Sequence, residues 1–374
     1  MAVVEVGWNI RAGYVGDTKC TRQTPSIRCA EVPTETCFPS ILMAAESVGT
    51  DSIQTIWTLR SLEHQMDHHM EHLAHIMGKE LGCSEDDPLM LVVPEIWHEQ
   101  FNVMQTLFRV ILESGFTSAL YCLRPSVART LASGKASAVV LDIGHNHATT
   151  TAVLDGYALR GTMTSSEVAG SAVTCRLMEM LDKRELESLE SVERYHLPSI
   201  REWALKDVVN DVKRMICRVR PGRSTLPRKE EEEPLVLRAP DGSLVTVGAN
   251  ARTEPYELLF APSSGAGKSL PDLLVTCKRC LDPEWQQQAV PHVLCGGTSQ
   301  TPGLRERLLK EVQQRDSSYF RYEKEGAFNV SEAVDGAWTG ASLAADSSSF
   351  ASLWVTRADM EEEGDSILHR KLFY

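Results

Sequence analysis

The sequence has no long apolar run and no excess of positive charge, and each absence excludes a class of protein. No window approaches the roughly 18 consecutive apolar residues of a transmembrane helix. The N-terminal residues lack the basic stretch and the following apolar stretch of a secretory signal. The 38 Lys and Arg against 51 Asp and Glu give a formal net charge of −13, which repels nucleic-acid backbones and anionic membranes. We therefore expect an unsecreted protein that binds neither membranes nor nucleic acid directly.

The composition otherwise indicates an ordinary folded protein. Hydrophobic residues make up 43% and charged residues 24% of the 374 residues, close to the average of globular domains. This length corresponds to about two to three domains, or to one fold with two large lobes. Several of the 10 cysteines lie in apolar runs, as Cys295 does after Val293 and Leu294, where a reduced thiol behaves as a small hydrophobe. We therefore expect a reducing compartment, the nucleus or the cytoplasm.

Two parts of the chain show the same order of features. Residues 3–6 and 10–15 predict two strands joined by a turn. Residues 138–144 predict a strand that ends at an Asp and a Gly, followed by a hairpin of residues 148–153 and 157–162. Because strand, acidic residue, glycine turn and hairpin recur, we infer an internal duplication of two α/β lobes.

Apolar residues at helical spacing predict helices around these strands. The predicted helices cover residues 61–80, 100–114, 208–216 and 304–312. A further strand, residues 293–298, runs into a Gly-Gly turn ahead of a helix, and such a turn leaves backbone N–H groups that can face an anion.

Four segments, in the right order and at near-family spacing, resemble the actin family. They are residues 11–17 (RAGYVGD), 141–159, 295–303 (CGGTSQTPG) and 366–373 (SILHRKLF). They are similar to the family's N-terminal segment, second phosphate segment, adenosine segment and C-terminus. One such motif is weak evidence, whereas four in register across nearly the whole chain are strong evidence.

The resemblance implies an α/β, actin-like fold of the ribonuclease H and Hsp70 type, with two duplicated lobes around a nucleotide cleft. The implied first lobe is residues 1–130 plus 331–374, with a small outer subdomain at about 28–66. The implied second lobe is residues 131–330, with an outer subdomain at about 176–261 and a flexible, Pro-, Arg- and Glu-rich loop at about 218–234.

The resemblance also implies that ATP or ADP with Mg is the candidate ligand of the cleft, held between two phosphate hairpins. Asp142 is the candidate metal-binding residue. The candidate nucleotide-binding residues are Gly7, Asp142, Gly144, Lys213, Gly296, Gly297, Thr298 and Gly340.

Both hairpins depart from the family pattern. Glu5 takes the position of an Asp, and the bulky Trp8 lies where small residues belong. His145 and Asn146 replace an Asp-Gly pair, which removes a carboxylate near the metal and a glycine near the phosphates.

Three further departures affect hydrolysis and nucleoside binding. The family's water-orienting glutamine falls at Pro125, its nearby histidine falls at Thr149, and the acidic neighbour of Lys213 is Arg214. In phosphoryl transfer the protein acts chiefly by positioning the reacting groups. Because these positioning residues are replaced, we expect that the protein is not an enzyme and that its ATP hydrolysis is at most residual.

These departures favour a non-catalytic actin-related subunit that docks partners in a larger assembly. Residues 11–14, 148–151 and 160–170 look closest to nuclear members found in chromatin-remodelling and histone-acetyltransferase complexes. The alternatives are a cytoskeletal protein of the dynactin-like or flagellar kind, and a slow ATPase that uses nucleotide as a switch. The polar loop at 262–269 and a shortened outer subdomain predict no self-assembly into filaments.

The resemblance places a partner-binding surface at residues 121–131 and 342–355. Leu343, Phe350 and Trp354 supply apolar side chains there, as does Leu353. Some of these side chains belong to the core. An exposed remainder would bind an amphipathic helix of another protein.

Three other motifs have weaker readings. The loop at 265–269 suggests a P-loop, but Pro262 stands where the pattern needs a glycine. Cys277 and Cys280 have the spacing of half a zinc site, and His64, His68 and His72 recur at helical spacing. We read the first as a flexible loop, and the histidines as a solvated helix face.

Overall fold

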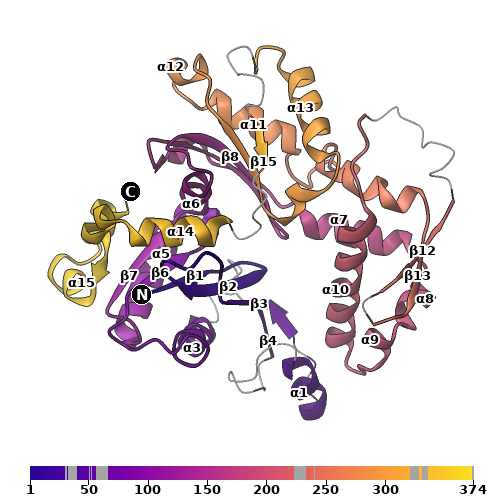
Figure 1. Ribbon diagram of the computed structural model, residues 1–374, viewed down its shortest axis with the longest axis horizontal. Coiled ribbons are helices and arrows are strands. Elements are labelled where there is room, and N and C mark those ends of the chain that lie inside the picture. Colours follow the sequence, from indigo (N-terminus) through magenta and orange to yellow (C-terminus); the bar gives the residue numbers. More distant parts are fainter. Residues whose placement is uncertain are drawn as a thin grey trace.

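Two lobes, each built on a mixed β-sheet, make up the fold (Figure 1). The computed structural model describes residues 1–29, 32, 40–49, 51, 53–55, 66–222, 233–239, 241–320, 328–330 and 336–372. Within these residues, no helix has both the length and the apolar character that a bilayer crossing requires.

The first sheet has the strand order β16-β7-β6-β1-β2-β3. Strand β1 pairs antiparallel with β2 and parallel with β6, and β6 is parallel to β7. The strands are β1 (Ala2–Glu5), β2 (Asn9–Tyr14), β3 (Arg22–Pro25), β6 (Leu89–Val92), β7 (Ala119–Leu123) and β16 (Val355–Thr356).

The second sheet repeats this arrangement. Strand β8 pairs antiparallel with β9 and parallel with β14, and β14 is parallel to β15. The strands are β8 (Ala138–Ile143), β9 (Ala148–Leu154), β10 (Tyr157–Ala158), β11 (Thr164–Ser166), β14 (His292–Cys295) and β15 (Phe328–Val330). The duplication inferred from the sequence is therefore confirmed, with β1 and β8 in equivalent positions.

Helices cover the sheets and join the lobes. Those with eight or more residues are α1 (Ser40–Val48), α3 (Met66–His75), α5 (Phe101–Ser114), α6 (Pro125–Ala132), α7 (Gly170–Met180), α10 (Pro198–Ile216), α11 (Leu270–Arg279), α13 (Leu304–Arg315) and α14 (Gly336–Asp346). The shorter ones are α4 (Glu95–His98), α8 (Lys183–Glu187), α9 (Glu190–Glu193), α12 (Pro283–Gln286), α15 (Arg357–Glu363) and α16 (Ser366–Lys371). Short segments of 3-10 or π helix cover Ile76–Glu80, Arg160–Thr162, Asn250–Arg252, Glu254–Leu259, Gly297–Gln300 and Ser348–Leu353.

The core has three parts. One lies between the first sheet and α5, where Leu107 and Phe108 are buried, and one fills the second lobe and extends to Ile41 and Leu42 of α1. The third joins the lobes: Val3 of β1 and Val140 of β8 belong to the same cluster as Ala128 of α6 and Trp338 of α14. Helices α6 and α14 therefore pack at the junction between the two sheets (Figure 1).

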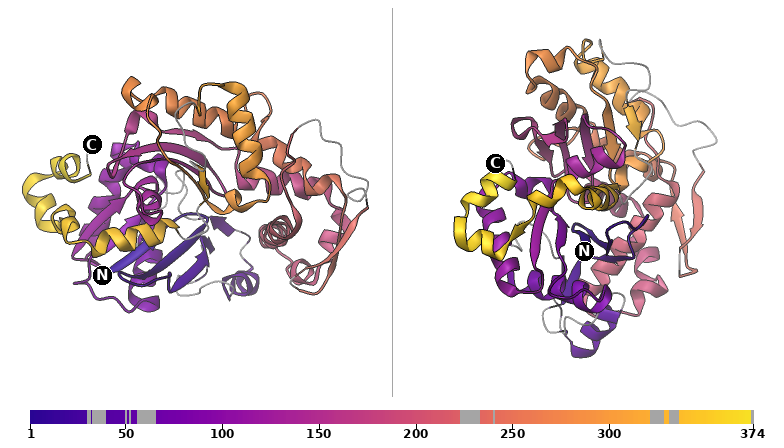
Figure 2. Two further views of the ribbon diagram at one scale, coloured as in Figure 1. Left: turned by 45° about the horizontal axis from the view of Figure 1, so that its top comes forward. Right: turned by 60° about the vertical axis from the view of Figure 1, so that its left-hand side comes forward.

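The C-terminal segment belongs to the first lobe. Strand β16 pairs antiparallel with β7, and the yellow segment lies beside the purple strands in both views of Figure 2. The chain thus returns to the sheet with which it began.

Most predicted elements are confirmed, but some differ in extent and other elements were not predicted. The second arm of the hairpin is a strand only over Tyr157–Ala158 and then becomes the 3-10 turn Arg160–Thr162. The hairpin of β12 (Leu235–Arg238) and β13 (Leu244–Val247) was not predicted. The helix predicted over residues 61–80 is described from Met66, as α3 and the π turn Ile76–Glu80; residues 61–65 and 223–232 lie outside the described part of the chain.

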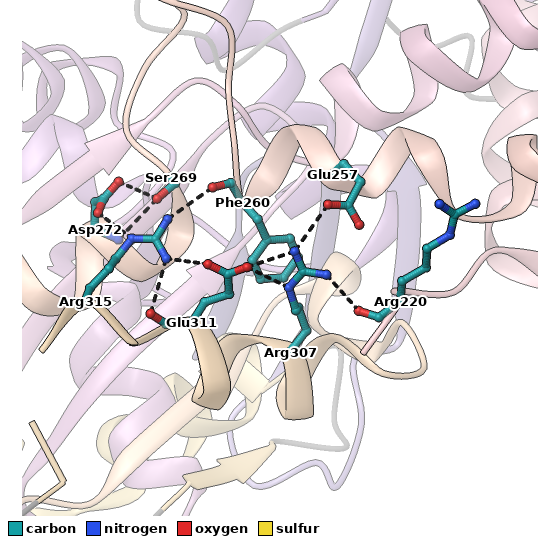
Figure 3. Close-up of polar contacts among 8 residues, drawn as sticks. All are labelled: Arg220, Glu257, Phe260, Ser269, Asp272, Arg307, Glu311 and Arg315. Atoms are coloured by element: carbon teal, nitrogen blue, oxygen red, sulfur yellow. Dashed lines mark hydrogen bonds and ion pairs between the residues drawn. The ribbon is translucent and has the colours of Figure 1, made fainter. Parts of the chain in front are cut away.

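A buried ionic network ties α13 to the rest of the second lobe (Figure 3). The Arg307 side chain, 1% exposed, pairs with Glu311 at 2.8 Å and with Glu257 at 3.3 Å. It also donates to the carbonyl oxygen of Arg220 at 3.1 Å. A guanidinium is retained here because each charge has a partner.

Candidate functional site

Two carboxylates face each other where the equivalent strands of the two lobes end. Glu5 is the last residue of β1, and Asp142 is the penultimate residue of β8. Arg129 of α6 reaches both: its Nε lies 3.0 Å from Asp142 Oδ2, and its Nη2 lies 3.7 Å from Glu5 Oε1. Arg11 of β2 pairs with the same Glu5 oxygen at 3.1 Å. The junction between the two sheets thus holds two carboxylates and two guanidinium groups.

Arg129 is charged despite its burial, with 6% of its side chain exposed. Burial alone lowers the pKa of an arginine, but the carboxylates of Asp142 and Glu5 outweigh it, and the pKa of Arg129 lies above its ordinary value. The four side chains therefore form a buried, charge-balanced cluster.

Some atoms of this cluster remain without a partner. In the described part of the chain, Glu5 Oε2, Asp142 Oδ1 and Arg129 Nη1 are buried and make no hydrogen bond. Buried polar atoms are normally satisfied by protein or by an ordered water molecule. A small polar molecule such as water can therefore hydrogen-bond to these atoms and bridge the Arg129 donor and the two carboxylate acceptors.

An aromatic pair joins the two hairpin turns. The Trp8 indole, between β1 and β2, stacks on the His145 imidazole, between β8 and β9, with ring centroids 3.8 Å apart. Burial, and then the charge of Lys213, lower the pKa of His145 to about 3, so the ring is neutral at physiological pH. The rings occupy the gap between the turns that the resemblance assigns to phosphate.

The N-terminus of α7 is engaged by the second hairpin turn. The Gly170 N–H donates to the Gly144 carbonyl oxygen at 3.1 Å, and the Ser171 N–H donates to the His145 carbonyl oxygen at 2.6 Å. Free N–H groups at a helix start attract anions, but these two are satisfied within the chain.

Two glycines, the predicted site residue Gly296 and Gly170 at the start of α7, allow the chain to pack closely on itself. Gly296 has φ +86°, and a Cβ there would lie 2.4 Å from Asp142 Oδ1. A Cβ on Gly170 would lie 2.7 Å from Thr298 Oγ1, which donates to the Gly144 carbonyl oxygen at 3.1 Å. The structure thus brings Asp142, Gly144, Gly296 and Thr298 together.

Lys213 joins the same group through α7. Its ammonium donates to the Gly170 carbonyl oxygen at 3.0 Å, to Thr174 Oγ1 at 2.8 Å and to Asn210 Oδ1 at 3.0 Å. Burial, then the charge of Arg214, lower its pKa to about 8. Three acceptors within the chain therefore satisfy this lysine.

Of the other predicted site residues, Gly7 and Gly340 belong to other segments, whereas Gly297 lies in the chain directly between Gly296 and Thr298. Gly7 lies half-buried in the β1–β2 turn, and Gly297 is exposed at the start of a 3-10 turn. Gly340 packs on α6, where a Cβ would lie 1.7 Å from the Ala128 carbonyl oxygen. Pro125 is the first residue of α6, and Thr149 lies in β9 opposite Asp142.

Sequence reasoning missed Arg129 and Arg11, which complete the cluster. One sequence feature could have indicated Arg129: it lies between Ala128 and Thr130, two buried residues, on a helix that follows a buried strand. A charged side chain in such a setting is retained only with a buried counter-charge. Its partner Glu5 is far away in sequence, so the pairing required the fold.

The structure describes only part of the metal motifs found in the sequence. Across the described ranges, no three His, Cys, Asp or Glu side chains are grouped as metal ligands; His64 lies outside these ranges. Ser269 of the P-loop-like segment caps α11 instead, since its Oγ accepts from the Asp272 N–H.

A cavity of 260 Å³ lies beside the aromatic pair, between the hairpin turns and helices α7 and α10. Its lining includes Trp8, His145, Cys175, Trp203 and Lys206. Its lining does not include the four side chains of the ionic cluster.

The residues present do not fit a magnesium–nucleotide complex in this arrangement. The carboxylates that would hold the metal are neutralised by Arg129 and Arg11. The rings of Trp8 and His145 fill the space between the turns, and the donors of α7 are already used.

Comparison with known proteins agrees with the resemblance read from the motifs. The family model described as Actin matches residues 1–373. A protein of Yarrowia lipolytica (strain CLIB 122 / E 150) named Actin-related protein 4 is 28% identical over 317 residues, 76% of this chain and 72% of the relative. Actin-related protein 4 of Oryza sativa subsp. indica is 26% identical over 319 residues, 77% of this chain and 71% of the relative.

Proposed function

This chain belongs to the actin family, and from that membership we propose that it is a non-catalytic docking subunit of a multiprotein assembly, a chromatin-remodelling or histone-acetyltransferase complex. The observation that carries the proposal is the cleft filled by Arg129, Trp8 and His145. The similarity of residues 11–14, 148–151 and 160–170 to nuclear members supports the choice of complex.

Hydrolysis of ATP is at most residual under this proposal. The actin fold generally binds nucleotide with Mg, but Pro125 offers no side-chain hydrogen bond to a water molecule and Thr149 is paired within β9. Steady-state phosphate release from the purified chain in Mg-ATP should stay at the level of a blank without protein. Release at the rate of polymerising actin would overturn this part of the proposal.

The surface proposed for docking lies on α14 and the 3-10 turn that follows it. Leu343 is 57% exposed. Phe350, Leu353 and Trp354 are partly buried against the core between the lobes, and Phe350 contacts Tyr121 edge to face, with ring centroids 5.0 Å apart. A helix with an apolar stripe would bury Leu343 and the exposed edges of its neighbours. The net charge of −13 favours a helix whose remaining face is basic.

Leu343→Asp tests this surface. We expect the tagged variant to lose its partners from a nuclear extract, while its melting temperature stays within about 2 °C of the unaltered chain, because the site is exposed. Met215→Asp on α10 is the matched control, since Met215 is also 57% exposed, and it should keep the partners. Retention of the same partners by a folded Leu343→Asp variant would exclude the surface.

Self-assembly distinguishes this function from a cytoskeletal one. The loop at 263–268 is exposed and carries no large apolar side chain, so it offers little apolar area to bury in a filament. We expect the chain to remain in the supernatant after sedimentation in Mg-ATP, and the tagged protein to localise to the nucleus. Regular filaments and a cytoplasmic location would favour the cytoskeletal alternative.

A further inference from the structure

The guanidinium of Arg129 lies between a carboxylate of the first sheet and a carboxylate of the second. We propose that Arg129 is a built-in counter-cation between the lobes, which joins Glu5 of the first sheet to Asp142 of the second, so that the closed arrangement of the lobes requires neither a divalent cation nor a nucleotide. Arg129 would act in this way whichever assembly the chain joins.

The position of Arg129 makes it a link between the two lobes. Glu5 and Asp142 belong to β1 and β8, which occupy equivalent positions in the two sheets. Arg129 belongs to α6, which packs at the junction of those sheets. Its contacts of 3.0 Å with Asp142 and 3.7 Å with Glu5 therefore connect one sheet to the other through a single side chain.

The charge of the cluster leaves no requirement for a metal ion. Glu5 and Asp142 contribute two negative charges, and Arg11 and Arg129 contribute two positive charges. A divalent ion added beside a buried guanidinium would be repelled strongly, because few water molecules screen it there. A metal could bind at the carboxylates only after Arg129 had moved away, and its own pairing opposes that movement.

The surroundings of the cluster oppose a phosphate chain in the same way. Phosphates between the hairpin turns would have to separate Trp8 from His145, whose centroids lie 3.8 Å apart. They would also have to displace the carbonyl oxygens that accept from Gly170 and Ser171. The Arg129 cation, the Trp8–His145 stack and the satisfied N–H groups of α7 are three separate observations. Each of them opposes binding of a metal ion or a phosphate chain at this position.

Binding measurements on the unaltered chain give the first test. Mn²⁺ counted by electron paramagnetic resonance and Mg-ATP titrated by calorimetry should both show no site tighter than about millimolar. One Mn²⁺ per molecule, or micromolar binding of Mg-ATP, would overturn the proposal. Tight binding of ATP in EDTA would also overturn it, since Arg129 would then pair with a phosphate.

The variant Arg129→Ala gives the second test, because it exposes the two carboxylates to a metal. We expect its melting temperature to fall by roughly 5–10 °C, as for a broken buried ion pair. Millimolar Mg²⁺ should restore at least half of that loss, and one Mn²⁺ per molecule should bind. The triple variant Arg129→Ala, Glu5→Gln, Asp142→Asn should bind none.

Arg124→Ala is the matched control for general loss of an ion pair. Arg124 lies just before α6 and also pairs with two carboxylates, Glu95 and Glu99, each at 2.8 Å. Its removal should lower the melting temperature without any response to Mg²⁺. An equal response of both variants, or a folded Arg129→Ala variant that ignores Mg²⁺ and Mn²⁺, would contradict the proposal. If Arg129→Ala does not fold, the measurements on the unaltered chain decide alone.

Discussion

Gly340 of α14 lies against the backbone of Ala128 in α6, so closely that a Cβ at position 340 would come within 1.7 Å of the Ala128 carbonyl oxygen. The obstacle is backbone rather than a side chain that can turn aside. The two helices carry the core between the sheets, with Trp338 donating from its indole to the Val3 carbonyl oxygen at 2.9 Å. Glycine at this position therefore sets how closely the lobes approach.

Gly340→Ala should lower the free energy of unfolding by about 3 kcal/mol or more, because the helices must separate to admit the methyl group. Urea denaturation measures the loss. Gly161→Ala is the control, since a Cβ at Gly161 meets no atom within 4 Å, and it should change stability by less than about 0.5 kcal/mol. Equal stability of both variants would show that α14 moves freely on α6.

Arg307→Ala should destabilise the second lobe by roughly 3–5 kcal/mol, because Glu257 and Oε1 of Glu311 lose their buried partner, although Arg315 still pairs with Oε2 of Glu311 (Figure 3). Its cation also lies 5.0 Å from the ring centroid of Phe260. Lys183→Ala is the contrast, since Lys183 is 83% exposed and pairs with Glu187 on the surface. That change should stay within about 0.5 kcal/mol by urea denaturation. Similar losses in both variants would refute the buried role of Arg307.

The repeated strands could be predicted because their signal is local. Residues 138–141 form a continuous apolar run before Asp142 and Gly144, and β8 (Ala138–Ile143) includes that run. The hairpin β12–β13 gave a weaker signal, since Leu235, Val236 and Leu244 are apolar but exposed, and only Val245 and Val247 of β13 are buried. Its strands follow from pairing with each other, which composition does not show.

The sequence predicted which strand ends lie near the candidate site, but not which side chains contact one another there. Motifs located the end of β8 to within one residue, because glycine and aspartate at a strand end carry a local signal, whereas β14 ends at Cys295, before the predicted end at residue 298. They could not show that Arg129 reaches Glu5, or that Lys213 is satisfied by Thr174 and Asn210. Those contacts join segments distant in sequence, and only the packing of α6 and α10 brings them together.

Lys213→Met should lower the free energy of unfolding by about 1–3 kcal/mol, because it removes a donor shared by three buried acceptors. The loss should be the same with and without Mg-ATP, as urea denaturation in both conditions would show. Lys206→Met on the same helix is the control: Lys206 is 36% exposed and pairs with Glu202 on the surface. If Mg-ATP stabilises the unaltered chain and not the Lys213→Met variant, Lys213 faces nucleotide instead.

Stability should fall as the pH drops from 7 to 5, because buried histidines resist protonation. Burial, and then the charge of Lys278, lower the pKa of His292 to about 3, and its Nε2 lies 2.8 Å from the Tyr319 hydroxyl. The pKa values of His145, about 3, and His72, about 4, are lowered in the same direction.

In the unfolded chain these histidines have pKa values near 6.5. Between pH 6.5 and the lowered pKa values of the folded chain, the unfolded chain therefore binds more protons than the folded chain. The stability contributed by neutral His292 is present above pH 6.5 and is lost progressively as the pH falls towards 3. From pH 7 to 5 its loss amounts to about 2 kcal/mol, before most carboxylates begin to titrate. Urea midpoints across this range should show that slope, and His292→Gln, which cannot be protonated, should show a shallower one. An unchanged slope in the variant would mean that His292 is protonated in the folded protein, contrary to its burial.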